Sequence, residues 1–145
     1  MSAATKPLLE ARVTLDVPFC DLDPMQVVWH GNYFRYFERG RQALLDAAGL
    51  DLYRIHGDEG YLFPVVRSAV KHIRPLRLRD RFECVARLLE ARNKLVIDFE
   101  LRLLPGGELC ARGRTEQVAV RAESGQLEYR IPEAIRRALE GEERA

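Results

Sequence analysis

The second half of the chain is a succession of strand-like segments separated by short turns, and one long helical segment precedes it. Residues 94–104 show the clearest alternation, because Leu95, Ile97 and Phe99 fall on one face of an extended chain. The turn that follows them is Pro105-Gly106-Gly107. Strands are predicted over residues 11–17, 62–74, 81–90, 94–104 and 108–121. Short turns between consecutive strands favour antiparallel pairing.

The spacing of apolar residues changes to that of an amphipathic helix after the loop at residues 18–31. Asn32 is a plausible N-cap of this helix, and Gly49 stands where a left-handed C-terminal cap would lie. Short helices are expected over 51–57 and after Pro132. One helix can cover one face of a five-stranded sheet, so the predicted class is α+β. The uncovered apolar surface predicts at least a dimer.

The bulk properties predict one ordinary globular domain over residues 11–140, with flexible ends at 1–10 and 141–145. The 145 residues carry a formal net charge of +1, which gives no support to a nucleic-acid partner. The three cysteines lack any CxxC spacing, which argues against a disulfide framework or a structural zinc site. The first residues contain no apolar signal segment, and no apolar run is long enough for membrane insertion. We therefore expect a cytoplasmic protein.

The most unusual segment is the loop from Asp21 to Tyr33, which places two carboxylates just before a predicted helix start. A helix N-terminus presents unpaired N–H groups and a partial positive charge, which suit a developing oxyanion. A nearby carboxylate can attack an acyl carbon or activate water. These groups are sufficient for acyl transfer. From the residues alone, an Asp-x-Asp-Pro string more commonly marks a turn in which each Asp bonds to its own backbone.

This loop and the helix after it resemble the active-site segment of the 4-hydroxybenzoyl-CoA thioesterase family, a family with the hot-dog fold. The resemblance is to the branch that includes the Tol-Pal-associated acyl-CoA thioesterases. The matching positions are Asp21, Asp23, Val27, Val28, Trp29, His30, Asn32, Tyr33, Phe37, Glu38, Arg39 and Arg41. Gly40 departs from the family pattern, which more often has Ala there; this glycine either loosens the helix or permits a close approach. The resemblance implies a five-stranded antiparallel sheet wrapped around one long central helix.

The resemblance also implies the roles of the loop residues. Asp23 corresponds to the catalytic carboxylate, acting as nucleophile or as general base, and Asp21 supports the loop. The backbone N–H at His30 polarises the thioester carbonyl, and its imidazole either bonds near the thioester or only lines the loop. The residues implied to bind substrate are Trp29, Gly31, Asn32 and Tyr33, although both aromatic residues fit a plain core role equally well.

Glu38 is the rival candidate for the catalytic carboxylate, because other hot-dog thioesterases carry theirs on the central helix. A helical wheel places it on the apolar face, where a carboxylate must be paired, and Arg41 is the obvious partner. We favour a structural ion pair. For the coenzyme A phosphates, the resemblance points to Arg92 and Lys94, often supplied by a neighbouring subunit.

The predicted function is therefore hydrolysis of a short-chain or aromatic acyl-CoA by a homodimer or homotetramer. No metal or cofactor is expected beyond coenzyme A as part of the substrate. The alternative is a catalytically silent hot-dog domain that binds acyl-CoA or acyl carrier protein. Retention of Asp23 beside the helix start favours the enzyme, because a binding protein has no need for that carboxylate.

Overall fold

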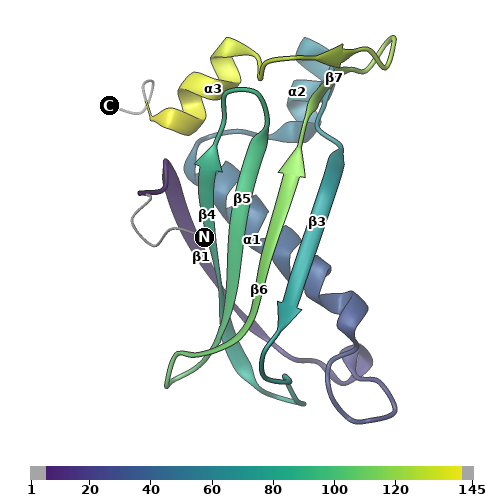
Figure 1. Cartoon of the computed structure of the whole chain (residues 1–145), viewed down its shortest axis with the longest axis vertical. Helices are drawn as coiled ribbons and strands as arrows, with labels where there is room; N and C mark the ends of the chain where they lie inside the picture. Colours follow the sequence, from purple (N-terminus) through teal and green to yellow (C-terminus); the bar gives the residue numbers. More distant parts are fainter. Residues whose placement is uncertain (1–5, 142–145) are drawn as a thin grey trace.

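The computed structural model describes residues 6–141, apart from the side chains at positions 53, 56 and 58. Its main feature is a five-stranded antiparallel sheet with the strand order β1-β4-β5-β6-β3 (Figure 1). The strands of this sheet are β1 (Leu9–Asp16), β3 (Val65–His72), β4 (Arg81–Glu90), β5 (Leu95–Leu103) and β6 (Glu108–Gln117). The predicted strands 11–17, 81–90 and 94–104 agree with β1, β4 and β5 to within two residues, and the predicted α+β class is confirmed.

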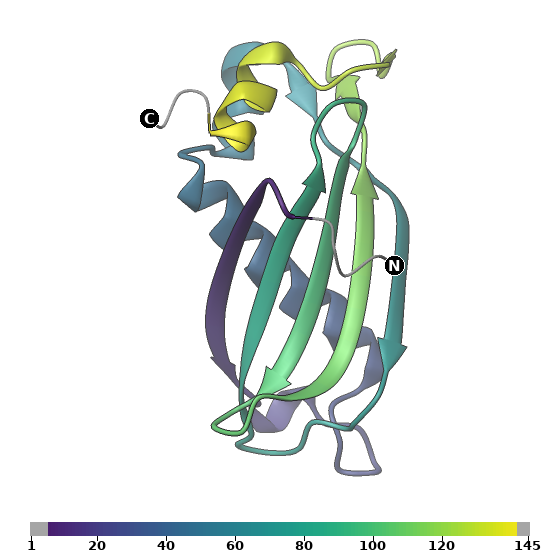
Figure 2. The same cartoon turned by 60° about the vertical axis from the view of Figure 1, so that its left-hand side comes forward.

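One long helix, α1 (Tyr33–Ala47), lies across one face of the sheet, which curves around it (Figure 2). The helix packs mainly against β1, β4 and β5. Phe37 is fully buried, and its ring stacks on Phe99 of β5 with the ring centroids 4.8 Å apart. The same ring occupies the space that a side chain at Gly113 would fill. The apolar face of the helix therefore forms the core with the sheet, as the periodicity predicts.

Gly40 marks the closest approach of α1 to the sheet. A Cβ atom at this position would lie 2.6 Å from the Sγ atom of Cys84 and 3.3 Å from the Cβ atom of Ala86. Both of these residues belong to β4 and are fully buried. Of the two explanations offered for this glycine, the structure supports close approach.

The two ends of α1 lie at the predicted cap residues, Asn32 and Gly49. Gly49 has a φ of +72°, so the predicted left-handed position after the helix is confirmed. Asn32 occupies the predicted N-cap position, directly before Tyr33, but its side chain makes no capping bond. A 3₁₀ turn, η2 (His30–Asn32), instead leads directly into the helix.

The predicted strands at 62–74 and 108–121 are each broken in two. The breaks produce β2 (Tyr61–Leu62) and β7 (Ala119–Arg121), which form a second, three-stranded sheet with β8 (Leu127–Glu128). Pro64 lies at the first break, where it has no N–H to donate, and its carbonyl accepts the Val118 amide at 3.2 Å. Pro64 therefore separates the pairing of β2 with β7 from the pairing of β3 with β6.

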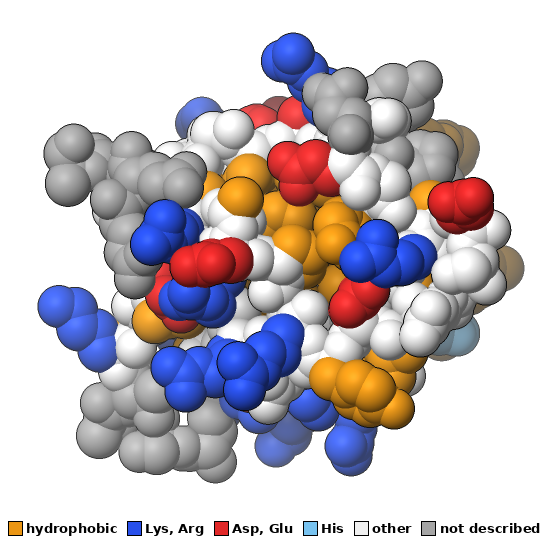
Figure 3. Space-filling view, turned by 90° about the horizontal axis from the view of Figure 1, so that it is seen from above, with side chains coloured by type: hydrophobic (Ala, Val, Ile, Leu, Met, Phe, Trp, Pro, Cys, Tyr) orange, Lys and Arg blue, Asp and Glu red, His pale blue; other side chains and the backbone are white. Residues whose placement is uncertain are grey.

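Short helices close one end of the sheet, where α2 (Leu52–Glu59) and α3 (Glu133–Glu140) lie together (Figure 1). Seen from this end, both basic and acidic side chains surround a small apolar patch (Figure 3). The short helices predicted over 51–57 and after Pro132 correspond to α2 and α3.

The first strand begins two residues before the predicted start at 11, because Leu9 already pairs with Leu88 of β4. Most of the ends predicted to be flexible, 1–10 and 141–145, lie outside the described residues. Within residues 6–141, no helix is long and apolar enough to cross a membrane.

The two edges of the sheet are β1 and β3, and they differ in exposure. Nearly every side chain of β3 is exposed, including Val65 and Val66 at 45% and 58%. The strand pairs only with β6 on one side. An edge strand of this kind presents unpaired backbone groups to any chain that approaches it.

Candidate functional site

The loop between β1 and α1 lies along the segment that connects β3 to β4, at the end of the sheet opposite to α2 and α3 (Figure 1). The Val17 amide donates to the Asp80 carbonyl at 3.0 Å, and the Val28 amide donates to the Leu76 carbonyl at 2.8 Å. Val28 and Leu76 are both buried. The two segments therefore support each other through backbone bonds and shared core.

Asp21 joins this loop to the first turns of α1. Its side chain is buried, and its two oxygens accept hydrogen bonds from the Tyr36 hydroxyl, at 2.6 Å, and from the Arg35 guanidinium. Its backbone carbonyl accepts from the Trp29 amide and the Asn32 side-chain amide, both at 2.9 Å. The Asn32 side chain thus bonds across the loop, which explains why it does not cap the helix.

The charge of Asp21 is stabilised by the same partners. Burial by itself raises the pKa of this carboxyl, but the hydrogen bonds from Tyr36 and Arg35 outweigh it and hold the pKa below its usual range. The same contact and burial raise the pKa of the Tyr36 hydroxyl. Asp21 is therefore ionised at neutral pH and fully engaged in holding the loop, as the resemblance implies.

Asp23 lies two residues further on, in a tight turn. The Asp23 amide donates to the Val27 carbonyl and the Gln26 amide donates to the Asp23 carbonyl, both at 2.9 Å. Gln26 closes the turn with a φ of +64°. The carboxylate oxygen Oδ1 accepts the Met25 amide at 2.8 Å, and among the described residues Oδ2 has no hydrogen-bond partner. One oxygen orients the carboxylate, while the other remains free for chemistry.

The start of the helix adjoins this carboxylate. The first N–H groups of a helix have no partner within it, so those at His30 and Gly31 lie at the positive end of α1. Trp29 precedes this turn, and its indole ring occupies the space beside Gly31, where a Cβ atom would be 2.3 Å from a ring carbon. The ring is half exposed and contacts the imidazole of His30, with the two ring centroids 5.2 Å apart.

A pocket of about 240 Å³ opens between the loop and the β3–β4 connection. Its walls are formed by Asp23, Met25, Val27, Val28, His30, Tyr33, His72, Ile73, Arg74 and Pro75. Three of the predicted site residues, Asp23, His30 and Tyr33, meet in this pocket. Three others, Trp29, Gly31 and Asn32, belong to the same turn but do not line it.

The sequence did not assign two polar residues of this pocket to the site. His72 ends β3, and Arg74 follows it in the connection to β4. The alternation of β3 places His72 on the same face as Val70, but only the pairing of β3 with β6 brings that strand end beside the loop. No local pattern in the sequence carries that information.

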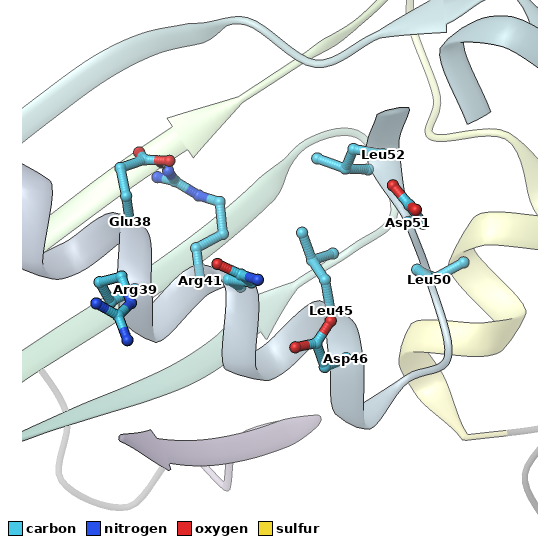
Figure 4. A pocket seen from close by; sticks show the side chains of 9 residues that line it. Glu38, Arg39, Arg41, Leu45, Asp46, Leu50, Asp51 and Leu52 are labelled. Carbon is cyan, nitrogen blue, oxygen red and sulfur yellow. Dashed lines mark hydrogen bonds and ion pairs between the residues drawn. The ribbon is translucent and has the colours of Figure 1, made fainter. Parts of the chain in front are cut away.

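Glu38 does not share the pocket of Asp23. It lines a second pocket, of about 400 Å³, between α1 and the segment that leads into α2 (Figure 4). Its side chain is 60% exposed, so the prediction that it lies on the apolar face is wrong. The predicted ion pair with Arg41 is confirmed, and Arg41 is the buried member.

Arg41 is held by more than Glu38. Its guanidinium donates to the Thr115 hydroxyl at 2.6 Å and lies over the ring of Phe99, 5.7 Å from the centroid. Burial lowers the pKa of Arg41 to about 10, so it remains charged at neutral pH. The exposed carboxylate of Glu38 therefore compensates a buried cation.

Arg92 and Lys94 lie at the other end of the sheet. They flank the turn after β4, whereas the loop that carries Asp23 adjoins the beginning of that strand, where Asp16 pairs with Arg81. Ten strand residues separate the two ends, which corresponds to roughly 30 Å. Lys94 forms an ion pair with Glu116 at 2.6 Å, and the Arg92 side chain is exposed. One chain cannot bring these residues to its own Asp23.

Among residues 6–141, no group of three or more His, Cys, Asp or Glu residues is arranged to hold a metal ion. The cysteines described there, Cys20, Cys84 and Cys110, are all free thiols. The polar groups that gather at the start of α1 are the Asp23 carboxylate, two imidazoles, the Arg74 guanidinium and the helix N-terminus.

Comparison with known proteins identifies the class that this fold and site define. The family model of the thioesterase-like superfamily matches residues 17–139, so the chain belongs to that superfamily. The "1,4-dihydroxy-2-naphthoyl-CoA hydrolase" of Rippkaea orientalis is 25% identical over 78% of this chain and 83% of its own length. The "Putative acyl-CoA thioesterase YneP" of Bacillus subtilis is 30% identical over 76% of this chain and 79% of its own length.

A solved structure of a 4-hydroxybenzoyl-CoA thioesterase variant, in complex with 4-hydroxybenzoyl-CoA, has the same fold. It superposes with a TM-score of 0.80 at 18% identity, covering 90% of this chain and 98% of that one. The predicted hot-dog fold and the thioesterase resemblance are confirmed.

Proposed function

We propose that this protein hydrolyses the thioester of an acyl-CoA, with Asp23 as its catalytic carboxylate. The observation that carries the proposal is the free Oδ2 oxygen of Asp23, in one pocket with the residues at the start of α1. The names of the relatives, a naphthoyl-CoA hydrolase and an acyl-CoA thioesterase, support the same reaction class.

The position of the helix start supports activation of the thioester carbonyl. A thioester carbonyl beside Asp23 would point its oxygen at the N–H groups of the first turn, where the backbone at His30 is placed. These donors and the helix dipole stabilise the negative charge that develops on that oxygen. The donors belong to the backbone, so their position is set by the fold.

Asp23 can bring about thioester hydrolysis by either of two routes. In the first, Oδ2 of Asp23 attacks the carbonyl carbon, the C–S bond breaks, the thiolate of coenzyme A leaves, and water then cleaves the mixed anhydride. In the second, Asp23 takes a proton from water as the water oxygen attacks, the C–S bond breaks, and the proton passes to the departing sulfur. Acid quenching within a single turnover, followed by mass spectrometry of the intact protein, would reveal an acyl-enzyme only for the first route.

The pocket suits a small acyl group. Its volume of about 240 Å³ is below the roughly 300–1,000 Å³ typical of pockets for drug-sized ligands. Most of the wall is apolar and is formed by Met25, Val27, Val28, Tyr33, Ile73 and Pro75. The polar groups of the wall come from Asp23, His30, His72 and Arg74. This composition supports the prediction of a short-chain or aromatic acyl group, and the chemistry requires no cofactor beyond coenzyme A as part of the substrate.

The test is the release of free thiol from a panel of aliphatic and aromatic acyl-CoAs, with Asp23→Asn and Glu38→Gln as the matched pair of carboxylate variants. We expect loss of activity only in Asp23→Asn. Full activity in Asp23→Asn would refute the assignment, and a loss confined to Glu38→Gln would move the role to α1. Binding of acyl-CoA without any cleavage would favour the alternative, a silent domain that binds acyl-CoA or acyl carrier protein.

We also propose that the functional unit is a homodimer or homotetramer in which Arg92 and Lys94 reach the coenzyme A of a neighbouring subunit. The exposed edge strand β3 supports association, and the distance of roughly 30 Å between these residues and Asp23 of one chain requires it. Their cationic side chains suit the phosphates of coenzyme A.

Subunit mixing tests this arrangement. Asp23→Asn and the Arg92→Ala/Lys94→Ala double variant would each be weakly active alone. After joint refolding, mixed oligomers contain some sites with every wild-type residue, so activity should rise above the sum of the two. Light scattering would give the mass of the assembly, and a monomer would overturn the proposal.

A further inference from the structure

The end of the molecule that carries the smaller pocket also exposes several large apolar side chains. They come from the β1–α1 loop and from the connection between β3 and β4, two segments joined by the backbone bridge between Val27 and Arg77 (Figure 1). Phe19 and Met25 are 78% and 77% exposed, and Leu78 is 40% exposed. Phe19 and Leu78 line neither of the two pockets described above. Exposed apolar side chains gathered in one place indicate contact with another surface.

Backbone bonds fix the positions of this apolar cluster (Phe19, Met25 and Leu78). The Arg79 amide donates to the Val17 carbonyl at 3.1 Å, which brings Leu78 beside the residues that precede Phe19. Phe19 itself begins a 3₁₀ turn, η1 (Phe19–Asp21), and its carbonyl accepts the amide of the residue after the turn at 3.2 Å. The side chains are therefore exposed although the backbone that carries them is bonded within the fold.

Arginines without an ion-pair partner accompany the apolar cluster. Residues 73–81 contain four arginines and one acidic residue, Asp80, although the whole chain has a formal net charge of only +1. The Asp80 carboxylate accepts the Arg77 amide at 2.8 Å. Arg74, Arg77 and Arg79 are exposed, and among the described residues none of them forms an ion pair, while the fourth arginine lies opposite an aspartate of β1. Three guanidinium groups at this end of the molecule are therefore available to anions.

This combination of apolar and cationic side chains fits an anionic membrane surface better than a protein partner. A protein would need pockets at matching positions for Phe19 and Met25, whereas the bilayer interface takes up apolar side chains in any arrangement. The headgroups of anionic lipids attract Lys and Arg side chains near the surface, wherever on the docking face these lie. The apolar cluster and the three free arginines supply these two contributions.

We propose that this end of the molecule is a docking surface for anionic membranes, in which the apolar cluster enters the interface and the free arginines contact lipid headgroups. Docking holds the entrance of the smaller pocket next to the headgroups, because Met25 and Arg74 belong both to the docking surface and to the pocket wall. The proposal is independent of the reaction assigned to Asp23, since it concerns binding of the protein and not cleavage of a thioester.

Trp29 provides the readout, because it is the only tryptophan of the chain and is 50% exposed on the same loop. The whole protein is mixed with vesicles of phosphatidylcholine alone, or of phosphatidylcholine and phosphatidylglycerol in equal parts. We expect a blue shift of the tryptophan emission, quenching by brominated lipids and cosedimentation with the anionic vesicles only. Binding should be lost at about 1 M salt, where the Debye length falls to about 3 Å.

Two variants test the two contributions separately. Arg77→Gln/Arg79→Asn removes two charges, and asparagine tolerates the φ of +66° at position 79. It should weaken the partition coefficient by about 20-fold, because each basic side chain near an anionic surface contributes a factor of about five. Phe19→Ala removes the most exposed apolar side chain of the cluster and should weaken partitioning by about tenfold.

Tyr129→Ala/Arg130→Gln is the matched control. It removes an aromatic side chain that is 82% exposed and an exposed arginine from the segment between β8 and α3, at the opposite end of the molecule, so its binding should equal that of wild type. Circular dichroism confirms that each variant is folded.

The proposal is wrong if wild type does not bind the anionic vesicles, or if either test variant binds them as wild type does. A loss of the same size in the control variant would also overturn it. If wild type ignores the vesicles but binds a purified acyl carrier protein through Arg77 and Arg79, the partner is an acidic protein and not a membrane. Thiol release is a separate measurement, and its absence in wild type would count against the proposed function alone.

Discussion

Two carboxylates lie beside α1, Asp23 before its start and Glu38 on its second turn, and each lines its own pocket. The pocket of Glu38 is the larger, at about 400 Å³ against 240 Å³. The two carboxylates differ in what they are bonded to. Glu38 is ion-paired with the buried Arg41, whereas Asp23 accepts one amide through Oδ1 and keeps Oδ2 free.

Under the proposed function the reaction takes place in the smaller of these two pockets, so bonding of the carboxylate and not pocket size distinguishes the two candidates. A carboxylate paired with a buried guanidinium is engaged in a structural contact, and its own exposure to solvent keeps the energetic contribution of that contact small. A carboxylate fixed by a backbone amide retains an oxygen that can attack or take a proton. The four predictions below test this contrast, beginning with the largest effect.

Asp23→Asn should lower kcat/KM for a cleaved acyl-CoA by about 100-fold to 10,000-fold, the range expected for loss of a general base. The amide cannot act as a base, but its oxygen can still accept the Met25 amide, so the turn should be retained. Thiol release measures the loss, and circular dichroism confirms the fold. A decrease of less than about threefold would remove the contrast between the two carboxylates.

Asp21→Asn should lower the free energy of unfolding by about 1–3 kcal/mol at pH 7, because two hydrogen bonds to a buried charge are weakened. The effect has a defined pH dependence. The folded pKa of Asp21 lies below its unfolded value of about 3.9, so its contribution is complete above that pH and disappears as the pH falls through the folded value.

Urea unfolding of wild type and Asp21→Asn at pH 7, and again below pH ~4, measures this dependence. The difference in free energy of unfolding between wild type and Asp21→Asn should become smaller on acidification. Tyr36→Phe serves as the control, because it removes one of the two donors and leaves the carboxylate in place. A larger difference in the free energy of unfolding at low pH would contradict the claim that Asp21 stabilises the fold through its charged form.

Gly40→Ala tests the helix on which both pockets depend. The new methyl group would meet Sγ of Cys84 at 2.6 Å, a clash that costs about 1–3 kcal/mol, while alanine returns up to about 1 kcal/mol of helix propensity. We expect a net loss of about 1 kcal/mol in the free energy of unfolding. Because Cys84→Ala removes the contacting atom, the loss should be smaller in that background, and double-mutant unfolding curves measure the coupling. Equal losses in both backgrounds would rule out this contact as the cause.

Glu38→Gln should have the smallest effect. The amide oxygen can still accept from Arg41, and the side chain at position 38 is 60% exposed, so the free energy of unfolding should change by less than about 1 kcal/mol. Activity should remain within about threefold of wild type in the thiol-release assay. A loss comparable with that of Asp23→Asn would show that the larger pocket holds the reaction.

The sequence predicted the fold well wherever the pattern was local. The alternation in β4 and β5 and the helical period of α1 arise from burial of one face, so they can be counted along the chain. The failures came from contacts made elsewhere. Asn32 was assigned as a cap by its residue type, but its amide bonds to the Asp21 carbonyl, a partner that the sequence does not indicate.

The residues of the candidate site also divide into those indicated by a local motif and those brought in by distant strand pairing. Asp23, His30 and Tyr33 come from one continuous motif, and the structure places all three in one pocket. His72 and Arg74 reach that pocket through the pairing of β3 with β6, which no short motif encodes. Glu38 was placed on the apolar face by its angle on the wheel. The long side chain of Arg41 is the one that enters the core, and Glu38 meets it from the solvent side.

The contact between Trp29 and Gly31 has a consequence for how this motif can change in evolution. The indole ring occupies the space of a Cβ atom at position 31, so a side chain there requires the ring to move or to be smaller. Sequences that carry a larger residue at position 31 should therefore carry a smaller one at position 29. Covariation of this pair across an alignment of related chains would be the expected result of a single steric contact at the start of α1.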